Sequence, residues 1–173
     1  MSVKPIVYVL TSWLLLCSGQ LVADEQKFQR FLDSVYSAPP SAKSLWLSAD
    51  DKAEIYQRFN YRLNRLRQRY WFADEASVWV LEEVGKEKPI TMAVAVKDQK
   101  VSAIEVLAYR ESRGGEIRHN FFRKQFIDAS LTEKNELSQN IDGITGATLS
   151  VRAMQKVAKV ALFLDQKAGA TAQ

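Results

Sequence analysis

Three short apolar runs, separated by charged turns, constrain the fold of this chain more than any other feature. Residues 78–81, 90–96 and 101–108 have the composition of β-strands, with valine and alanine prominent. Residues 85–88 and 97–100 lie between them and consist mostly of charged and polar residues typical of turns. Connections this short join antiparallel neighbours. The sequence therefore predicts an antiparallel meander within an α+β fold, a small antiparallel or mixed sheet with packed helices.

Helical periodicity lies on both sides of these strands. Residues 24–72 precede them, first as a short apolar stripe and then as a longer helix with an N-cap at Ser48. We expect that longer helix to continue to Tyr70. Its apolar stripe consists of Ile55, Phe59, Leu63, Leu66 and Tyr70. Residues 120–126 predict a short helix, and residues 150–164 predict the closing helix, followed by a small, polar and frayed tail.

Four arginines form a second stripe on the same expected helix, about 90° from the apolar one. They are Arg58, Arg62, Arg65 and Arg69. Such a stripe is either a solvated flank, whose stems cover the edge of the apolar face, or a docking surface for phosphate, anionic lipid or an acidic redox partner. We do not expect nucleic acid as a partner, because basic and aromatic residues are not interleaved as on an exposed binding sheet.

The first 23 residues have the pattern of a secretory signal peptide that is cleaved before Asp24. Lys4 gives a positive start, residues 6–17 form an apolar run, and Ala23 is a small residue before the cut. The run is shorter than the ~20 residues needed to cross a bilayer, which disfavours an uncleaved anchor. We therefore expect a periplasmic protein, with anchoring to the membrane on its periplasmic side as the alternative.

Cysteine and histidine are almost absent from the chain. Cys17 is the only cysteine and lies in the leader, and His119 is the only histidine. A mature chain would then lack a thiolate metal site, an iron–sulfur cluster and a haem attachment sequence, and one histidine is too few for a multi-histidine metal site. Any redox role must therefore use an organic cofactor. The net charge of +4 permits contact with anionic lipid or acidic proteins but indicates neither.

The segment from Asp142 to Ser150 has the composition of a phosphate-binding helix start. It reads Asp-Gly-Ile-Thr-Gly-Ala-Thr-Leu-Ser, directly before the closing helix. The free N–H groups and the dipole of a helix start favour a phosphate, and Gly143 and Gly146 permit close approach of a ligand. Thr148 offers a hydroxyl that can form a phosphoester, and Ser150 can cap the helix. Physically, the same residues fit an ordinary turn and cap about equally well.

Residues 142–148 resemble the flavinylation motif of the FMN-binding domain family, which includes the C subunit of the sodium-pumping NADH:quinone reductase and the G subunit of Rnf complexes. The family's pattern is an acidic residue, two variable positions, serine or threonine, and then Gly-Ala-Thr, and the chain meets every fixed position. In that family the last threonine carries FMN through a phosphoester formed by a separate FAD:protein FMN transferase. The resemblance implies Thr148 as the attachment residue, with Gly146 and Ala147 around the phosphate.

The resemblance to this family extends over roughly residues 77–163 and includes the loop that begins at Glu111. There the family more often has Glu-Thr-Pro-Gly-Leu-Gly, and this chain has Ser-Arg-Gly-Gly in place of Thr-Pro-Gly-Leu. Glu111 and Arg113 either contact the flavin, where Arg113 would offset the charge of the reduced ring, or pair with each other on the surface. The implied cofactor-binding residues are Thr148, Ala147, Gly146, Thr145, Asp142, Ser150, Glu111, Arg113 and Gly114.

Several further residues are candidate partners for a flavin ring, and each also has a plainer interpretation. Trp71, Trp79 and Tyr70 could stack on an isoalloxazine, although aromatic residues at the ends of strands and helices more often belong to the core. His119 is better explained as a polar residue at a helix start than as a proton donor.

These observations divide the chain into a signal peptide (1–23), an N-terminal helical segment (24–75), an FMN-binding domain (76–166) and a flexible tail (167–173). The expected function is that of an exported flavoprotein that carries electrons through FMN on Thr148, since the sequence contains no catalytic triad, metal cluster or nicotinamide fingerprint. The alternatives are a sensor or interaction module that binds FMN or phosphate, and an FMN-dependent reductase of a small extracytoplasmic acceptor. Expected partners are the FMN transferase and a redox protein, namely a cytochrome, a membrane reductase or another flavoprotein.

Overall fold

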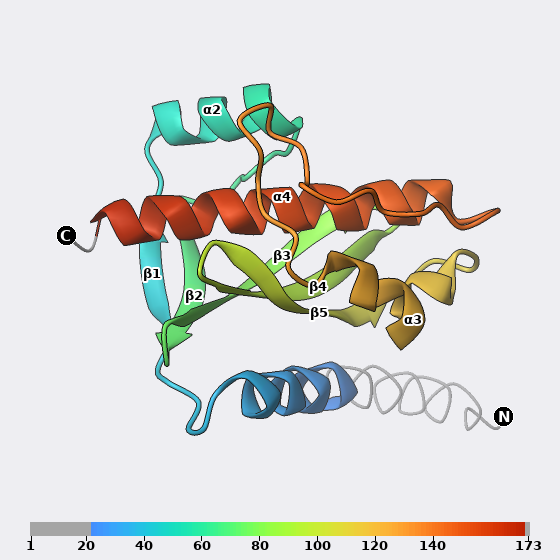
Figure 1. Ribbon diagram of the computed structural model, residues 1–173, viewed down its shortest axis with the longest axis horizontal. Helices are drawn as coiled ribbons and strands as arrows, with labels where there is room; N and C mark the ends of the chain where they lie inside the picture. The colour runs from blue at the N-terminus through green and yellow to red at the C-terminus, as the bar shows by residue number, and fades with distance from the viewer. Residues whose placement is uncertain (1–21, 172–173) are drawn as a thin grey trace, which may run out of the picture.

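The centre of the molecule is a five-stranded antiparallel sheet in the order β1-β2-β3-β4-β5 (Figure 1). The structure, a computed structural model, describes residues 22–171. The strands are β1 (Lys43–Trp46), β2 (Arg67–Ala73), β3 (Ala76–Val84), β4 (Pro89–Lys97) and β5 (Lys100–Tyr109). The α+β class and the predicted meander are therefore confirmed. The predicted signal peptide lies outside the described residues, except for residues 22 and 23.

Helices cover both faces of this sheet. The helix over residues 22–35 lies on one face, and α4 (Thr148–Thr171) crosses the other (Figure 1). The shorter helices are α2 (Ala49–Phe59), η1 (Gly115–Arg118), α3 (Asn120–Arg123) and η2 (Lys124–Phe126), of which η1 and η2 are 3₁₀ helices. The short helix predicted over residues 120–126 and the closing helix are thus both present, the former as α3 followed by η2.

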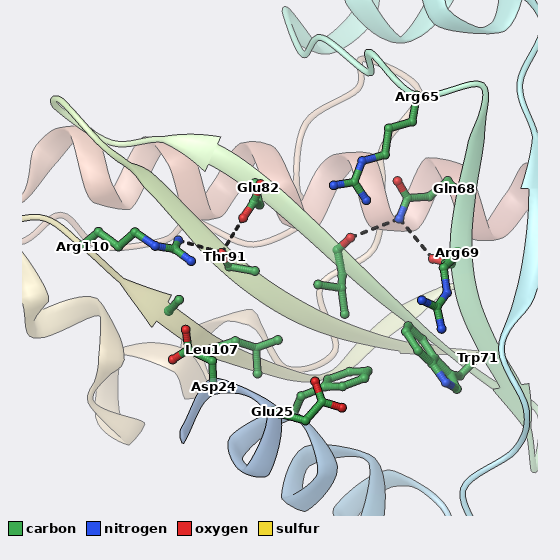
Figure 2. Close-up of a pocket in the computed structure, with 13 residues that line it drawn as sticks. Asp24, Glu25, Arg65, Gln68, Arg69, Trp71, Glu82, Thr91, Leu107 and Arg110 are labelled. Carbon is green, nitrogen blue, oxygen red and sulfur yellow. Dashed lines mark hydrogen bonds between the residues drawn. The ribbon is translucent and has the colours of Figure 1, made fainter. Parts of the chain in front are cut away.

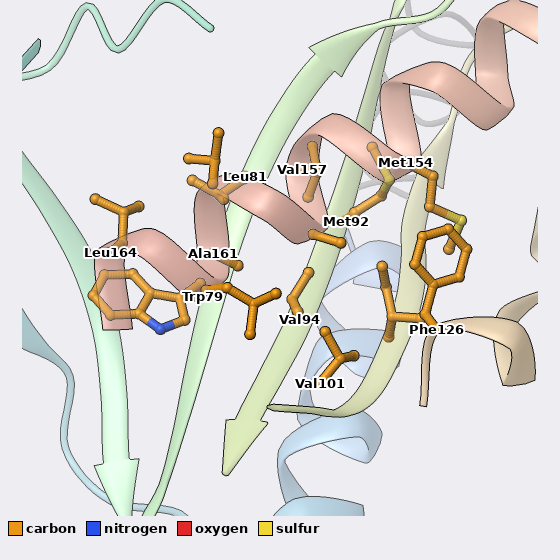
Figure 3. Packing of buried hydrophobic residues seen from close by; sticks show 14 of the residues in the cluster. Trp79, Leu81, Met92, Val94, Val101, Phe126, Met154, Val157, Ala161 and Leu164 are labelled. Atoms are coloured by element: carbon orange, nitrogen blue, oxygen red, sulfur yellow. The ribbon is translucent and has the colours of Figure 1, made fainter. Parts of the chain in front are cut away.

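Alternating side chains of β3 and β4 build two separate cores. Toward α4 the strands present large residues, so that Trp79 lies beside Ala161 and Leu164 of the helix, while Met92 lies near Met154 (Figure 3). Toward the helix over residues 22–35 they present mostly small residues, which contact Phe31 and Leu32. These small residues are Ala76, Val78, Ala93 and Ala95. Burial on both faces explains why β4 has a nearly continuous apolar sequence.

The predicted helix through Tyr70 is wrong beyond Phe59. Its start is confirmed, since Ser48 Oγ accepts a hydrogen bond from the N–H of Asp51 at 3.0 Å. Its end falls at Asn60, which has a left-handed φ of 49° and closes α2. Residues 67–73 then form β2, where Tyr70 stacks on Trp79 with ring centroids 4.7 Å apart. Three consecutive aromatic residues at 70–72 favour a strand, and this cross-strand pairing outweighs the helical spacing.

The N-terminal segment is therefore part of the sheet and not wholly helical. The boundary predicted between residues 75 and 76 falls in the β2–β3 hairpin, whose turn residues Asp74 and Glu75 both have positive φ, as two-residue hairpins of type I′ require. The arginine stripe is consequently not one helical face. Its members lie in α2 (Arg58), in the segment between α2 and β2 (Arg62, Arg65) and in β2 (Arg69).

The C-terminal tail predicted from Lys167 onward is helical as far as Thr171. Ala168 is buried in the core on the α4 side of the sheet. Lys167 forms ion pairs with Asp51 and Glu54 of α2, the latter at 3.3 Å. These contacts extend α4 past the predicted end of the domain. Across residues 22–171, no helix combines the length and the apolar character that a membrane crossing requires.

Candidate functional site

The start of α4 carries the predicted attachment residue. Thr148 is the first residue of the helix, and the carbonyl of Ala147 accepts the first helical hydrogen bond, from the N–H of Val151 at 3.0 Å. The N–H groups of a first turn have no carbonyl one turn earlier to which they can donate, so they present the positive end of the helix. The side chain of Thr148 is exposed, whereas Ala147 is buried. A solvent-facing hydroxyl therefore lies at the positive end of a 24-residue helix.

A tight turn leads the chain into this helix start. The N–H of Ala147 donates to the carbonyl of Ile144 at 2.9 Å, which makes Thr145 and Gly146 the central residues of the turn. Gly146 has a φ of 82°, the left-handed value that a type II turn requires at its third residue. Upstream, the N–H of Asp142 donates to Gln125 Oε1 at 2.8 Å. The turn therefore requires glycine at position 146, because its backbone is left-handed there.

The loop after β5 packs closely against the same helix start. Gly114 has a φ of 81°, and a Cβ atom there would lie 2.8 Å from Ser150 Oγ and 3.4 Å from Ala147 Cα. Only glycine readily adopts this backbone angle and also leaves room for the loop to lie this close to α4. The structure thus brings residues 111–115 and 145–150, which the sequence places about 30 positions apart, into direct contact.

Ser150 is not the N-cap of α4, because it lies inside the helix as its third residue. Its side chain is only 4% exposed, and its Oγ is 3.1 Å from Tyr109 Oη. Tyr109 Oη also donates to the carbonyl of Arg113, and burial raises the pKa of Tyr109. These two hydroxyls join β5, the loop and α4. Ser150 therefore holds the loop in place, and Tyr109, whose role no local sequence pattern indicates, is its partner.

An open cavity of about 430 Å³ lies between this loop and the turn before α4. Of the residues expected from the sequence, Arg113, Gly114, Thr145 and Gly146 line it. The remaining lining residues are Ser112, Gly115, Glu116, Arg118 and His119. Sequence reasoning did not select Arg118, which lies over the ring of Tyr109 at 5.3 Å and donates to the carbonyl of Gly115. The cavity is thus bordered by two arginines and by the turn that precedes Thr148.

Glu111 has a different role from both of those considered above. Its Oε1 accepts hydrogen bonds from the backbone N–H groups of Lys86 (2.6 Å), Glu87 (2.8 Å) and Lys88 (3.1 Å). It therefore holds the β3–β4 turn and does not pair with Arg113. These backbone bonds, that from Glu87 first, lower the pKa of Glu111. The loop is consequently fixed at one end by Glu111 and at the other by Tyr109 and Ser150.

We expect the NMR signals of the backbone amides of Lys86, Glu87 and Lys88 to shift together as Glu111 is protonated, at a pH below the ordinary range for glutamate. The three bonds favour the ionised carboxylate, so their stabilisation is complete above the pKa that Glu111 has in the unfolded chain and is lost as pH falls through its lowered folded value. An NMR pH titration of these amides measures the effect. Glu111→Gln should remove it and leave the amides of the 98–99 turn unchanged. If the three amides follow different pKa values, or if their pH dependence persists in Glu111→Gln, Glu111 is not the group that holds the β3–β4 turn.

The aromatic residues proposed as alternative flavin partners lie elsewhere. Trp79 is fully buried in the core, where it stacks on Tyr70 and its Nε1 donates to Ser77 Oγ at 2.7 Å. Trp71 packs edge-on against Phe28 on the other face of the sheet. These three residues do not line the cavity, and the core interpretation of Trp79 is confirmed. His119 occupies the N-cap position of α3, as expected for a residue at a helix start, while it also lines the cavity.

Within residues 22–171, no group of three or more histidine, cysteine, aspartate or glutamate side chains is arranged to hold a metal ion. The site instead combines a helix start, a glycine turn and a cavity with two arginines, which suits a ligand that bears a phosphate. Residues 85–162 match the profile of the FMN-binding domain family. This region of the chain is therefore similar to an FMN-binding domain. No curated protein matches the chain.

The matched region contains the loop, the cavity and the start of α4, and it ends within that helix. FMN fits the residues present there. The first-turn N–H groups of α4 suit its phosphate, and the glycine at position 146 leaves the approach open, since no heavy atom lies within 4 Å of where its Cβ would be. The arginines at 113 and 118 border the space beside that phosphate position. The family and the site thus agree on a flavin-binding domain.

Proposed function

We propose that this protein carries electrons outside the cytoplasm through FMN that is attached covalently to Thr148. The observation that carries the proposal is the exposed hydroxyl of Thr148 at the positive end of α4, directly after the turn that borders the cavity. A phosphate joined to that hydroxyl would lie at the unpaired N–H groups of the helix. Covalent attachment suits an exported protein, because a dissociated cofactor would be lost.

Thr148 is favoured over the other two hydroxyl residues of the segment. Ser150 is buried and bonded to Tyr109, so its hydroxyl is not accessible to a modifying enzyme. Thr145 is exposed but belongs to the turn and precedes the helix. In the proposed reaction Thr148 Oγ displaces AMP from FAD. One P–O bond to Thr148 forms, the bond between the two phosphates breaks, and the hydroxyl proton is released. A FAD:protein FMN transferase would catalyse this step.

Bound FMN would supply the redox chemistry, since it can take up and release one or two electrons. The chain's own residues would hold and tune the cofactor. Arg113 and Arg118 border the cavity and would favour negative charge on a reduced ring. The redox partner would be a cytochrome, a membrane reductase or another flavoprotein. Export would follow from the leader over residues 1–23, and a periplasmic location, free or anchored to the membrane, is part of the proposal.

Intact mass spectrometry of the full chain, co-expressed with an active FMN transferase, tests the proposal. The expected result is an added mass equal to FMN less one water, found by peptide mapping on the peptide that contains Thr148. The same spectrum determines whether the mature chain begins at Asp24. An unmodified chain, in cells where a known substrate of the transferase is flavinylated, would overturn the proposal.

A further inference from the structure

A second cavity, of about 380 Å³, lies on the face of the sheet opposite α4, between β2, β3, β4 and β5 and the helix over residues 22–35 (Figure 2). This volume is within the range of about 300–1,000 Å³ that small-molecule sites occupy. None of its lining residues belongs to α4 or to the loop at residues 111–119. The sheet therefore separates this cavity from the flavin site, and nothing assigned so far accounts for it.

Three arginines from three different segments converge on this cavity. Arg65 comes from the segment before β2, Arg69 from β2, and Arg110 from the residue after β5 (Figure 2). Within residues 22–171 no acidic side chain forms an ion pair with any of the three. Arg110 is oriented by bonds to Thr91 Oγ1 (3.0 Å) and the carbonyl of Pro89 (3.3 Å). Arginine suits this use, because its planar fork binds carboxylate, phosphate and sulfonate groups.

An adjoining part of the cavity wall is apolar and aromatic. Trp71 is half-buried there and is braced edge-on by Phe28, with ring centroids 4.7 Å apart. Leu107 continues this surface, and the guanidinium of Arg69 lies 5.5 Å from the centre of the Trp71 ring. An arginine beside an indole offers a flat surface with a cationic end. A flat organic anion would place its ring against Trp71 and its acidic group against Arg65 and Arg69.

Acidic residues limit which anions the cavity can take. Glu82 lines it and accepts a hydrogen bond from Thr91 Oγ1 at 2.7 Å, and Asp24 and Glu25 of the helix over residues 22–35 also line it (Figure 2). These carboxylates would repel a broadly anionic partner such as a lipid surface or an acidic protein. We propose that this cavity binds a small, flat organic anion with a single acidic group.

Fluorescence titration with 8-anilinonaphthalene-1-sulfonate, on the full chain made without the FMN transferase, tests this proposal independently of flavin attachment. The expected result is binding of one probe molecule per chain, weakened about tenfold or more in the double variant Arg65→Gln/Arg69→Gln, because each charge-assisted bond contributes a large share of the affinity. The matched control is Arg152→Gln, which changes an exposed arginine on α4, across the sheet, and should leave the affinity unchanged.

Two further measurements separate this site from adventitious binding. The uncharged analogue N-phenyl-1-naphthylamine should bind more weakly than the sulfonate, with an affinity that the double arginine variant does not change. Trp71→Leu should weaken both probes. The variant Arg65→Lys/Arg69→Lys keeps both charges and should regain most of the sulfonate affinity, which guards against a folding defect in the glutamine variant. Equal sulfonate affinity in wild type and the glutamine variant, or equal affinity for the two probes, overturns the proposal.

Discussion

Thr148→Val should abolish covalent flavin on the protein completely. Valine has nearly the shape of threonine but lacks the Oγ atom to which the phosphate would be joined. The position is exposed at the first residue of α4, so the fold should be retained, with a change in stability of within about 0.5 kcal/mol. Co-expression with the transferase followed by intact mass spectrometry should show the added mass in wild type and none of it in the variant.

Two companion variants make this result specific. Thr145→Val removes the neighbouring exposed hydroxyl of the turn and should leave the added mass intact. Thr148→Ser restores a hydroxyl at the same position and should restore the modification at least in part. Retention of the mass in Thr148→Val, or its loss in Thr145→Val alone, would show that the phosphoester is formed elsewhere.

The part of the fold that the sequence predicts well is the part where local pattern and tertiary structure agree. The strands at 76–109 alternate or run continuously apolar between short polar turns, and α4 repeats its core residues at helical spacing. The N-terminal strands were missed for a physical reason. The apolar residues from Ile55 to Tyr70 have helical spacing, and this spacing is outweighed by the pairing of β2 with β3, in which Tyr70 stacks on Trp79. That pairing depends on β3, which lies outside the segment whose spacing predicts a helix.

In the candidate site too, the sequence predicts the features that depend on neighbouring residues and misses the roles that depend on distant partners. The glycine turn and the helix that follows it are local features that the sequence predicts, although α4 begins at Thr148 and not at the predicted Ser150. The roles of Ser150 and Glu111 were not predictable, because their partners are distant in the sequence. Ser150 contacts Tyr109, 41 residues earlier, and Glu111 binds backbone groups 23–25 residues earlier. In this site, Ser150 and Glu111 therefore hold the loop in place.

Three glycines of the site should respond very differently to substitution by alanine. Gly143 has no heavy atom within 4 Å of a Cβ position and no left-handed φ, so alanine there should change the free energy of unfolding by within about 0.5 kcal/mol. Gly146 has equal space but a φ of 82°, so alanine should cost about 1–2 kcal/mol in backbone strain. At Gly114 the same strain is joined by a contact of 2.8 Å with Ser150 Oγ, and the total should be about 2–5 kcal/mol.

Urea unfolding of the three variants measures these costs, and intact mass after co-expression measures their effect on the flavin. Because Gly114 lies where the loop meets Ala147 and Ser150, its alanine variant should push the loop away from α4 and reduce flavin attachment, while Gly143→Ala should be modified like wild type. The order of the costs is the decisive result. If Gly114→Ala unfolds no more easily than Gly146→Ala, the loop is not held against the helix as tightly as the structure indicates, and the close approach of these two segments does not shape the flavin site.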